Sequence, residues 1–412
     1  MRAVVDRFNA SQDRLWVRYF STGTIDQKAM IAIAGGDPPD ILGLGNFSIP
    51  AYAESGAILP LDGLAAKAGI RREAYAPAVW PMLTHPTAGA PWNAGGTPRL
   101  YGMVNTCGAL AMFYNRAIFR EAGLDPDRPP RTIDELDETH RKLCLFEGGG
   151  TRPGDGRPLL RAGFLHTEPD WWTWHWGYHF GGSLYDSSTD RATAAMPDNV
   201  RAYQWMQTYP RSLGVQRVVQ FQTGFGFYGT AEHPFLAGKI AMTNQGPWLA
   251  NVIKQYKPDL DYGVAPFPVD TQMYDPDRPV GLLDCDVLVI PRGAKHPEAS
   301  FEFIAFTQRP ENIEFLSAAH GKNSPLVSQS PGFERDHANR YVAVHSKIAN
   351  SPRAFIFPRT RTWQEYVSEF NALQQRMWRL EIEPGAGLAQ VQAVAQAQLD
   401  RVADARRRRA GA

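Results

Sequence analysis

Helical and extended hydrophobic patterns alternate along the first part of the chain. Residues 3–10 carry apolar side chains at helical spacing, and residues 15–20 alternate apolar with polar side chains as a half-buried strand does. Residues 26–34 again have helical spacing, two glycines follow them, and residues 40–44 form a short apolar run that suits a buried strand. This succession with short loops predicts the α/β class, with mostly parallel sheets flanked by helices.

The same succession continues to the end of the chain. Apolar runs predict strands over 110–114, 262–265 and 286–290. The clearest helix start is at Thr132, where Glu135 completes a capping box before an amphipathic stretch that reaches about residue 146. Further helices are expected over 198–209, 363–380 and 388–406. The sequence shows no repeat of the solenoid type.

Length and charge narrow the classes of function. The 412 residues favour two or more compact domains, or two lobes that share a hinge. Lys and Arg number 43 against 42 Asp and Glu, so the net charge of +1 provides no long-range field for holding nucleic acid. The run Arg406–Arg409 is expected to be a solvated terminus.

Cysteine content and hydropathy exclude further classes of protein. Cys107, Cys144 and Cys285 are too few and too odd in number for a disulfide framework, and they contain no CxxC pair. No apolar stretch approaches the ~18 residues of a membrane helix. Met1 leads directly into an amphipathic helix rather than into an apolar secretion signal. Neither a metal nor an organic cofactor is predicted.

The densest unusual feature is the aromatic run that begins at Trp171. It places four of the eleven tryptophans within six residues. Adjacent positions on a helix point apart, so one face cannot bury all of these rings. For a single ring, a place in the core is as good an interpretation as ligand contact. For the group we favour ligand contact, because flat aromatic faces suit the C–H face of a sugar ring.

Two further rings are candidates for the same role. Trp248 follows Gly246 and Pro247 in a turn that leads into a helix. Trp363 begins the penultimate helix after a polar loop. Bulky rings in such positions are expected to project from the loop.

Patterns for catalysis or metal binding are weak. His175 and His179 have helical spacing but lack the glutamate of a zinc-protease motif, which favours polar core or cleft-lining roles. Four carboxylates near aromatic residues could supply a glycosidase pair, namely Glu168, Asp170, Asp284 and Asp286. Sequence spacing does not establish the separation that this chemistry needs. No Gly-x-Ser-x-Gly nucleophile motif is present. We therefore predict no catalytic residues.

Ordered landmarks resemble the family 1 extracellular solute-binding proteins of ABC importers, the group that includes maltose-binding protein. They run from residue 4 to about residue 405 in the order of that family. The most distinctive are 34–40 (AGGDPPD), 52–61 (YAESGAILPL), 113–124, 129–136 (PPRTIDEL), 235–242 (FLAGKIAM), 245–248 (QGPW) and 262–268 (YGVAPFP). Each segment alone is weak, but the ordered set is highly specific.

The resemblance implies a two-lobed, periplasmic-binding-protein-like fold of type II with a ligand cleft between the lobes. The expected N-terminal lobe comprises 1–110 and 262–318, and the C-terminal lobe comprises 111–261 and 319–412. Hinge crossings are expected near 108–113, 258–264 and 315–325. A solute that bridges both lobes binds the closed state preferentially and so shifts the population toward it.

The resemblance also implies a binding site. In the family a tryptophan after Gly-Pro stacks on sugar, which points to Trp248. Aromatic positions after the Glu-Pro dipeptide and at the penultimate helix correspond to Trp171 and Trp363. The remaining residues expected at the cleft are Asp26, Asn46, Gly246, Asp284, Arg359 and Arg361.

The function implied by the resemblance is non-catalytic capture of a mono- or oligosaccharide by a monomer that delivers it to the permease subunits of an ABC importer. The expected location is periplasmic or extracellular, with a lipid anchor left open. The family begins with a signal peptide and a strand ahead of the first helix, so an incomplete N-terminus is expected here. Gly108 stands where maltose binders carry a carboxylate, which argues against maltose.

Three alternatives stay open at this point. A phosphorylated polyol such as a glycerol phosphate could be clamped by Arg359 and Arg361. A glycoside hydrolase would use the same aromatic platforms with a carboxylate pair. A sensor would have the same two lobes but would pass its signal to a membrane receptor.

Overall fold

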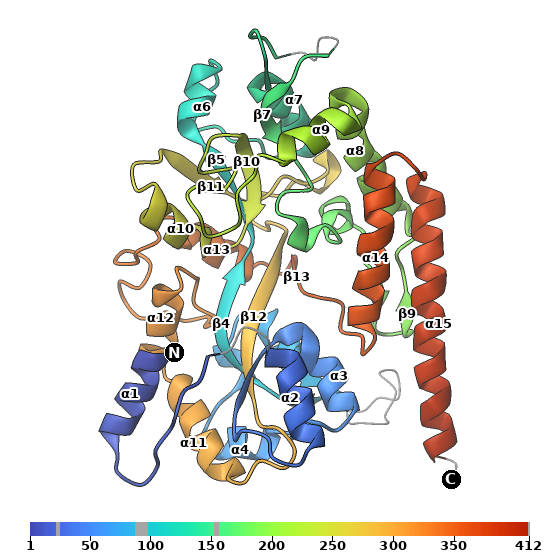
Figure 1. Ribbon diagram of the computed structural model, residues 1–412. Coiled ribbons are helices and arrows are strands. Elements are labelled where there is room, and N and C mark those ends of the chain that lie inside the picture. The colour runs from blue at the N-terminus through green and yellow to red at the C-terminus, as the bar shows by residue number, and fades with distance from the viewer. Residues whose placement is uncertain (22–24, 87–97, 152–155, 411–412) are drawn as a thin grey trace.

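The computed structural model describes residues 1–21, 25–86, 98–151 and 156–410, and it contains two main β-sheets (Figure 1). The smaller sheet has four strands, and β12 pairs with each of the other three. The ladders with β1 and β4 are antiparallel and the ladder with β13 is parallel. The strands are β1 (Leu42–Gly45), β4 (Met103–Ala109), β12 (Gly281–Val289) and β13 (Ala354–Phe355).

The larger sheet has the strand order β11-β5-β10-β7-β6. Its strands are β5 (Ala111–Asn115), β6 (Leu145–Phe146), β7 (Leu159–Phe164), β10 (Ile240–Gln245) and β11 (Tyr262–Ala265). Only the β10–β7 ladder of this sheet is parallel. The expectation of mostly parallel sheets is therefore wrong in detail. The α/β alternation suggested sequence neighbours joined by helices, whereas most of these ladders join strands that are distant in the sequence.

The two sheets are joined at β4 and β5. A single residue, Leu110, separates these strands, and its N–H donates to the carbonyl of Leu282 in β12. In Figure 1, β4 and β12 run side by side along the long axis of the molecule between its two halves. The two-lobed α/β architecture is thus the one expected from the sequence.

We propose lobe limits that differ from the sequence-based ones at two places. Residues 354–355, which lie within the expected C-terminal lobe, pair as β13 with β12 of the smaller sheet. β11 pairs with β5 of the larger sheet. We therefore place the second crossing after residue 265, between β11 and β12, rather than near 258–264. Residues 262–265 then belong with the C-terminal lobe instead of the N-terminal one.

Short helices surround the smaller sheet. They are α1 (Arg2–Ser11), α2 (Ile25–Ala34), α3 (Ile49–Glu54), α4 (Asp62–Lys67), α5 (Val79–Leu83), α11 (Pro297–Thr307), α12 (Pro310–Ala319) and α13 (Val342–Ala349). The ring of Phe8 fixes α1 to α11 by packing edge-on against Phe303 and Phe306. The strand expected over 15–20 is an irregular segment, because the side-chain amide of Asn9 forms hydrogen bonds with both the backbone N–H and the backbone C=O of Val17.

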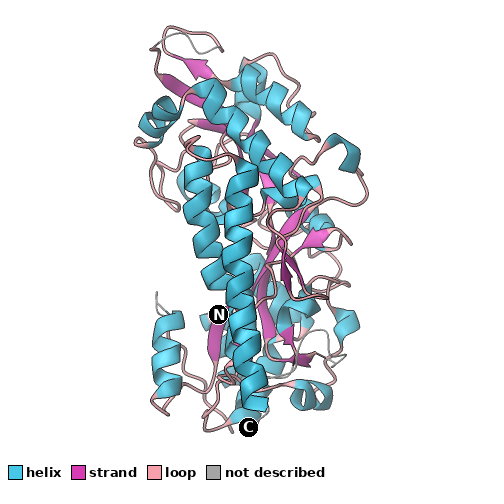
Figure 2. Cartoon of the chain, turned by 90° about the vertical axis from the view of Figure 1, so that its right-hand side faces the viewer, coloured by secondary structure: helices cyan, strands magenta, loops and turns pink. Residues whose placement is uncertain are grey.

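The remaining α-helices belong to the larger half, where α14 and α15 pack against α8. They are α6 (Arg116–Glu121), α7 (Ile133–Leu143), α8 (Pro197–Leu213), α9 (Val215–Gln222), α10 (Leu249–Tyr256), α14 (Trp363–Trp378) and α15 (Pro384–Ala410). Thr132 is confirmed as the N-cap, because its hydroxyl accepts from the N–H of Glu135. The reciprocal bond of the expected capping box is shifted by one residue, since the Glu135 carboxylate accepts from the N–H of Arg131. The last two helices pack side by side (Figure 2), and α15 begins at Pro384 rather than at 388.

Several small elements complete the described chain. Two hairpin-like pairs are β2 (Thr84–His85) with β3 (Arg99–Leu100), and β8 (Tyr185–Asp186) with β9 (Arg191–Ala192). The 3₁₀ turns are η1 (Asn46–Ser48), η2 (Arg72–Ala74), η3 (Asp170–Trp172), η4 (Trp176–Phe180) and η5 (Thr271–Met273). Two of these turns, η1 and η3, supply side chains to the site described next.

Candidate functional site

The candidate site starts from one face of the paired strands β4 and β12. The register places Asp284 opposite Gly108 and Asp286 opposite Thr106. Side chains alternate between the two faces of a strand, so these four positions share one face of the sheet. Two carboxylates therefore project from the same side of the smaller sheet, a short distance from the crossing into the larger one.

Asp284 is held by a residue from the end of β1. The side-chain amide of Asn46 donates to Oδ1 of Asp284 at 2.8 Å, and Asn46 is itself buried. Burial, followed by the neighbouring charge of Asp286, raises the pKa of the Asp284 carboxyl to about 6. The hydrogen bond from Asn46 acts in the opposite direction, because it favours the ionised form. At neutral pH this side chain is an ionised acceptor.

Asp286 is paired with a buried lysine. Nζ of Lys322 lies 2.8 Å from Oδ2 of Asp286 and donates to the hydroxyl of Thr106 at 2.7 Å. The lysine side chain is 8% exposed, whereas that of Asp286 is 50% exposed. Burial acts to raise the pKa of Asp286, but the charge and hydrogen bond of Lys322 outweigh it and the pKa is lowered. One oxygen-rich edge of the pair therefore stays open to solvent.

Trp248 closes this polar face from the side of the larger sheet. Nζ of Lys322 lies 5.4 Å from the centroid of the indole ring, which is a cation–π distance. The ring passes so close to Gly246 that a Cβ there would lie 2.2 Å from it, and a Cβ on Gly108 would lie 3.1 Å from it. A glycine is therefore needed at 246 to seat the ring, and Gly108 leaves it room in β4.

A chain of aromatic rings continues from Trp248. The ring of Trp172 lies 6.5 Å from that of Trp248 and 5.8 Å from that of Phe357. Phe357 in turn lies 5.3 Å from Phe47, the neighbour of Asn46. The rings thus lead back to the polar side chains of the smaller sheet. We call Asn46, Trp172, Trp248, Asp284, Asp286, Lys322 and Phe357 the aromatic–polar group.

The beginning of the aromatic run forms an exposed flank of this group. Trp171 is 42% exposed and its ring lies 4.9 Å from that of Tyr228. Burial, followed by the charge of Asp170, raises the pKa of Glu168 to about 7. Nε2 of His233 lies 4.0 Å from the Glu168 carboxylate. This flank adds a second carboxyl with a raised pKa, beside exposed aromatic surface.

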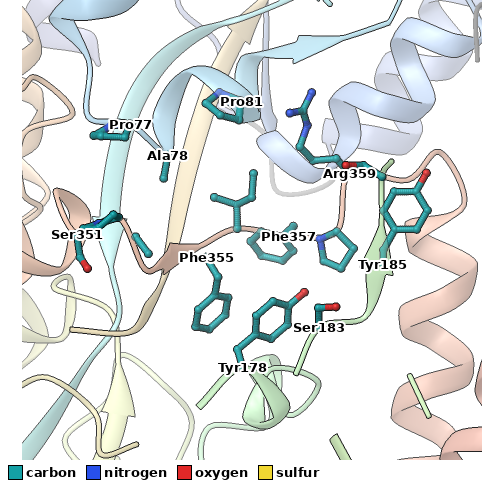
Figure 3. A pocket seen from close by; sticks show the side chains of 15 residues that line it. Pro77, Ala78, Pro81, Tyr178, Ser183, Tyr185, Ser351, Phe355, Phe357 and Arg359 are labelled. Carbon is teal, nitrogen blue, oxygen red and sulfur yellow. The ribbon is translucent and has the colours of Figure 1, made fainter. Parts of the chain in front are cut away.

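A cavity of about 430 Å³ adjoins Phe357 (Figure 3). Its walls come from the segment before α5, from the aromatic run and from the loop that precedes α14, including Ala78, Tyr178 and Arg359. In the picture Phe355 and Tyr178 lie beside each other below Phe357, and their rings stack at 4.3 Å. Arg359 donates to the carbonyl of Thr84 at 2.8 Å, and burial lowers its pKa to about 10.

Comparison with known proteins decides the family. The sequence pattern of the bacterial extracellular solute-binding proteins matches residues 1–314. The chain belongs to this family. The resemblance drawn from the sequence landmarks is confirmed, and the family places the solute-binding protein in the periplasm or outside the cell. Within the described ranges, every helix is too short or too polar to cross a membrane.

Three similar proteins illustrate the range of the family. A maltotriose-binding protein of Pyrococcus abyssi is 23% identical over 332 residues, which cover 80% of this chain but only 59% of that protein. The sn-glycerol-3-phosphate-binding periplasmic protein of Pectobacterium atrosepticum is 23% identical over 378 residues, covering 86% and 78%. The solved structure of CpMnBP1 with mannobiose bound has a TM-score of 0.77 at 24% identity, with 96% and 95% of the chains covered.

Some of the expected site residues lie together in this solute-binding protein. The structure brings Asn46, Gly246, Trp248 and Asp284 to the aromatic–polar group, with Trp171 at its flank. Arg359 lines the adjoining cavity. Asp26 lies in the first turn of α2, but its side chain is outside the described part of the structure.

Two expected residues lie elsewhere. Trp363 is 2% exposed and packs edge-on against Trp174 at 5.1 Å, so it supports the core behind Phe357. Arg361 is buried and donates to the carbonyl of Leu399 in α15 at 2.9 Å. The sequence correctly identifies the loop that contains Arg361 and the helix that begins at Trp363. The directions of the two side chains depend on the packing of α14 and α15, which local patterns do not encode.

Several members of the site are absent from the sequence-based set. Lys322 and Phe357 have no role in the sequence-based interpretation. Trp172 enters it only as part of the aromatic run, and Asp286 and Glu168 enter it only as candidate glycosidase carboxylates. The role of Asp286 at the ligand site was open to prediction, because two carboxylates alternate with buried residues along β12. Lys322 follows the end of α12 without any local motif, so only the tertiary structure identifies it.

Proposed function

We propose that the chain is the substrate-binding component of an ABC importer and that it captures a carbohydrate for delivery to the membrane permease. The observation that carries this proposal is the aromatic–polar group, in which exposed ring surface and charged oxygen and nitrogen atoms meet between the two sheets. The family is one of binding proteins, which supports a non-catalytic role. We further propose that the protein acts as a monomer.

The chemistry of the group suits a sugar. Trp248 and Trp172 offer apolar ring surface to the C–H face of a pyranose. Asp284 and Asp286 accept hydrogen bonds from hydroxyl groups, and charge-assisted bonds of this kind are roughly twice as strong as neutral ones. The indole N–H of Trp172 is buried and has no hydrogen-bond partner among the described residues, so it is a donor that a ligand oxygen would satisfy.

Delivery to a permease requires that the bound state differs from the free state. The polar side chains of the group stand on the smaller sheet and its flanking turn, while Trp248 and Trp172 belong to the larger half. A ligand that contacts both sets would favour a closed arrangement of the lobes by its differential affinity for that state. This proposal includes the lobe limits given above.

A phosphorylated polyol is the second candidate, because the Pectobacterium relative is named for glycerol 3-phosphate. The charges of the group argue against it. The two negative charges of Asp284 and Asp286 outnumber the one positive charge of Lys322, and the ammonium group of this lysine already pairs with Asp286. A phosphate would meet net negative charge at this point. Arg361, one half of the expected clamp, is directed to α15.

Isothermal titration with mannobiose, mannotriose, maltotriose, glycerol 3-phosphate and glycerophosphocholine tests the proposal. We expect saturable binding of at least one saccharide, recovered intact by mass spectrometry. Trp248→Ala should weaken that binding by about 2 kcal/mol, whereas Trp16→Ala, on a ring that is 77% exposed in the N-terminal segment, should leave it unchanged. Binding of the phosphorylated ligands alone, or release of a hydrolysed sugar, would overturn the assignment.

A further inference from the structure

Cys107 in β4 and Cys285 in β12 face each other across the smaller sheet. They are direct register partners in the antiparallel ladder, and both are fully buried. Each alternates with the residues of the polar face, Thr106 and Gly108 on one strand and Asp284 and Asp286 on the other. The two thiols therefore lie immediately behind the floor of the aromatic–polar group.

The hydrogen-bond pattern identifies the type of this pair. Leu110 donates its N–H to the carbonyl of Leu282, which makes that pair a hydrogen-bonded one. Hydrogen-bonded and non-hydrogen-bonded pairs alternate along an antiparallel ladder, so three steps further on the two cysteines form a non-hydrogen-bonded pair. An independent contact agrees, because the carbonyl of Cys285 accepts from Asn46 at 3.0 Å on the β1 side, away from β4.

That pair type has the dimensions of a disulfide. Opposed Cα atoms in a non-hydrogen-bonded pair are about 4.5 Å apart, which lies within the range of roughly 4.4–6.8 Å found in disulfides. Burial, followed by the neighbouring Cys107 thiol, raises the pKa of the Cys285 thiol, which agrees with the proximity that the register gives. A bond between them therefore needs no change in the register of β4 against β12.

The third cysteine does not compete for either partner. Cys144 follows α7 and lies in the apolar cluster of the larger half, whereas Cys107 and Cys285 lie in the cluster of the smaller half. Its sulfur is 3.6 Å from Nε2 of His140. The structure thus leaves one intramolecular pairing with suitable geometry.

We propose that Cys107 and Cys285 form a cross-strand disulfide when the protein matures in an oxidising compartment. All three cysteines are thiols in the structure. The oxidant is a small or protein-borne disulfide: one cysteine thiolate attacks it and releases one thiol, and the second cysteine then attacks the mixed disulfide and releases the other. Two protein thiols become one S–S bond and one oxidant disulfide becomes two thiols. Because both cysteines are buried, the exchange occurs before the sheet closes.

The inference goes beyond ligand binding and depends on the location of the protein rather than on its substrate. A disulfide at this position would fix the register of β4 against β12 directly behind Asp284 and Asp286. The strands that carry the polar floor of the site would then be held together covalently, on the face that the ligand does not touch.

Thiol counting on wild-type protein tests the proposal. Protein exported into an oxidising compartment, and protein made in a reducing one and refolded with a glutathione disulfide buffer, are denatured in excess maleimide without reductant. We expect one alkylated cysteine per chain, Cys144, and three after reduction. A non-reducing peptide map should contain one linked pair, with Cys107 and Cys285.

Variants provide matched controls. In Cys144→Ser we expect no alkylation before reduction and two alkylated cysteines after it. In Cys107→Ser, Cys144 and Cys285 should both be alkylated with or without reduction. Three alkylated cysteines in both wild-type preparations, or a linked peptide that contains Cys144, would overturn the proposal. Neither result depends on a sugar being bound, so the test is separate from that of the proposed function.

Discussion

The side-chain amide of Asn46 donates a 2.8 Å hydrogen bond to the carboxylate of Asp284, a residue 238 positions later in the chain. The same amide donates to the carbonyl of Cys285 at 3.0 Å. A single side chain at the end of β1 therefore satisfies two acceptors on β12, and it stabilises the ionised form of the carboxyl that faces the site.

Asn46→Ala is expected to destabilise the protein by about 1–3 kcal/mol, because it leaves a buried carboxylate and a buried carbonyl without their donor. It should also raise the pKa of Asp284. Urea unfolding measures the first effect, and an NMR titration of the carboxyl carbon measures the second. A variant with unchanged stability and an unchanged titration would show that this hydrogen bond has no role.

The affinity for sugar should depend on pH through Asp284. Burial and the charge of Asp286 raise its pKa to about 6. As the pH falls through that value the carboxyl becomes protonated and loses acceptor strength, so affinity should decrease from pH ~7.5 to ~5. Titration calorimetry across this range measures the effect. Asp284→Asn should remove the transition near pH 6.

Glu168 provides the control for that experiment, since its pKa is raised to about 7. Glu168→Gln should leave the transition of Asp284 in place.

The raised pKa of Asp284 affects the stability of the fold in the opposite direction from its effect on sugar affinity. A carboxyl whose pKa is higher in the folded than in the unfolded state stabilises the fold fully below its unfolded pKa, and this contribution is lost as the pH rises through the folded value. Unfolding measured from pH ~4 to ~7 should show a smaller loss in Asp284→Asn than in wild type, because the raised pKa of Glu168 keeps its own contribution in that variant.

The position of the Trp248 ring can be tested without removing it. A methyl group on Gly246 would meet the ring at 2.2 Å. Gly246→Ala should displace the indole and reduce sugar affinity at least tenfold, or about 1.4 kcal/mol. Gly63→Ala in α4 is the matched control, because a Cβ there meets nothing within 4 Å. Equal affinities of the two variants would mean that the ligand does not contact this ring.

The Lys322–Asp286 pair should matter more for binding than for folding. Asp286 is half exposed, so water screens the pair and its contribution to stability should be at most ~1 kcal/mol. Lys322→Met should raise the pKa of Asp286, because the charge that lowers it is gone. A double-mutant cycle with Asp286→Asn, measured by sugar titration and by unfolding, separates the two effects. If the two substitutions are coupled in the free energy of unfolding but not in sugar affinity, the pair has a structural role only.

The sequence predicts the architecture better than the directions of side chains. The N-cap at Thr132 and the family landmarks depend on residues close together in the chain, and both are confirmed. The strand expected over 15–20 failed because Asn9 occupies its backbone groups, a contact that the alternating pattern does not contain. The sheets are mixed rather than mostly parallel for a similar reason: their ladders join distant segments.

The same distinction applies to the site. Trp248 follows a Gly-Pro turn that constrains it locally, and it reaches the aromatic–polar group. Trp363 was chosen from an equally local feature, yet the packing of Trp174 and Tyr366 directs it into the core. Lys322 and Phe357 owe their positions to tertiary contacts alone. Side chains whose neighbours are distant in sequence require the folded structure for their assignment.

The junction at Leu110 has a mechanical consequence. One residue joins β4 to β5, and the backbone N–H of that residue is tied to β12. A rotation of one half of the molecule against the other at this point must be taken up by a few backbone torsions, since no flexible loop is present to absorb it. The junction is therefore a stiff connection between the two halves. It restricts the rotation of one half against the other to very few directions. The outer surface of the protein would therefore undergo the same displacement whichever part of the ligand causes the rotation.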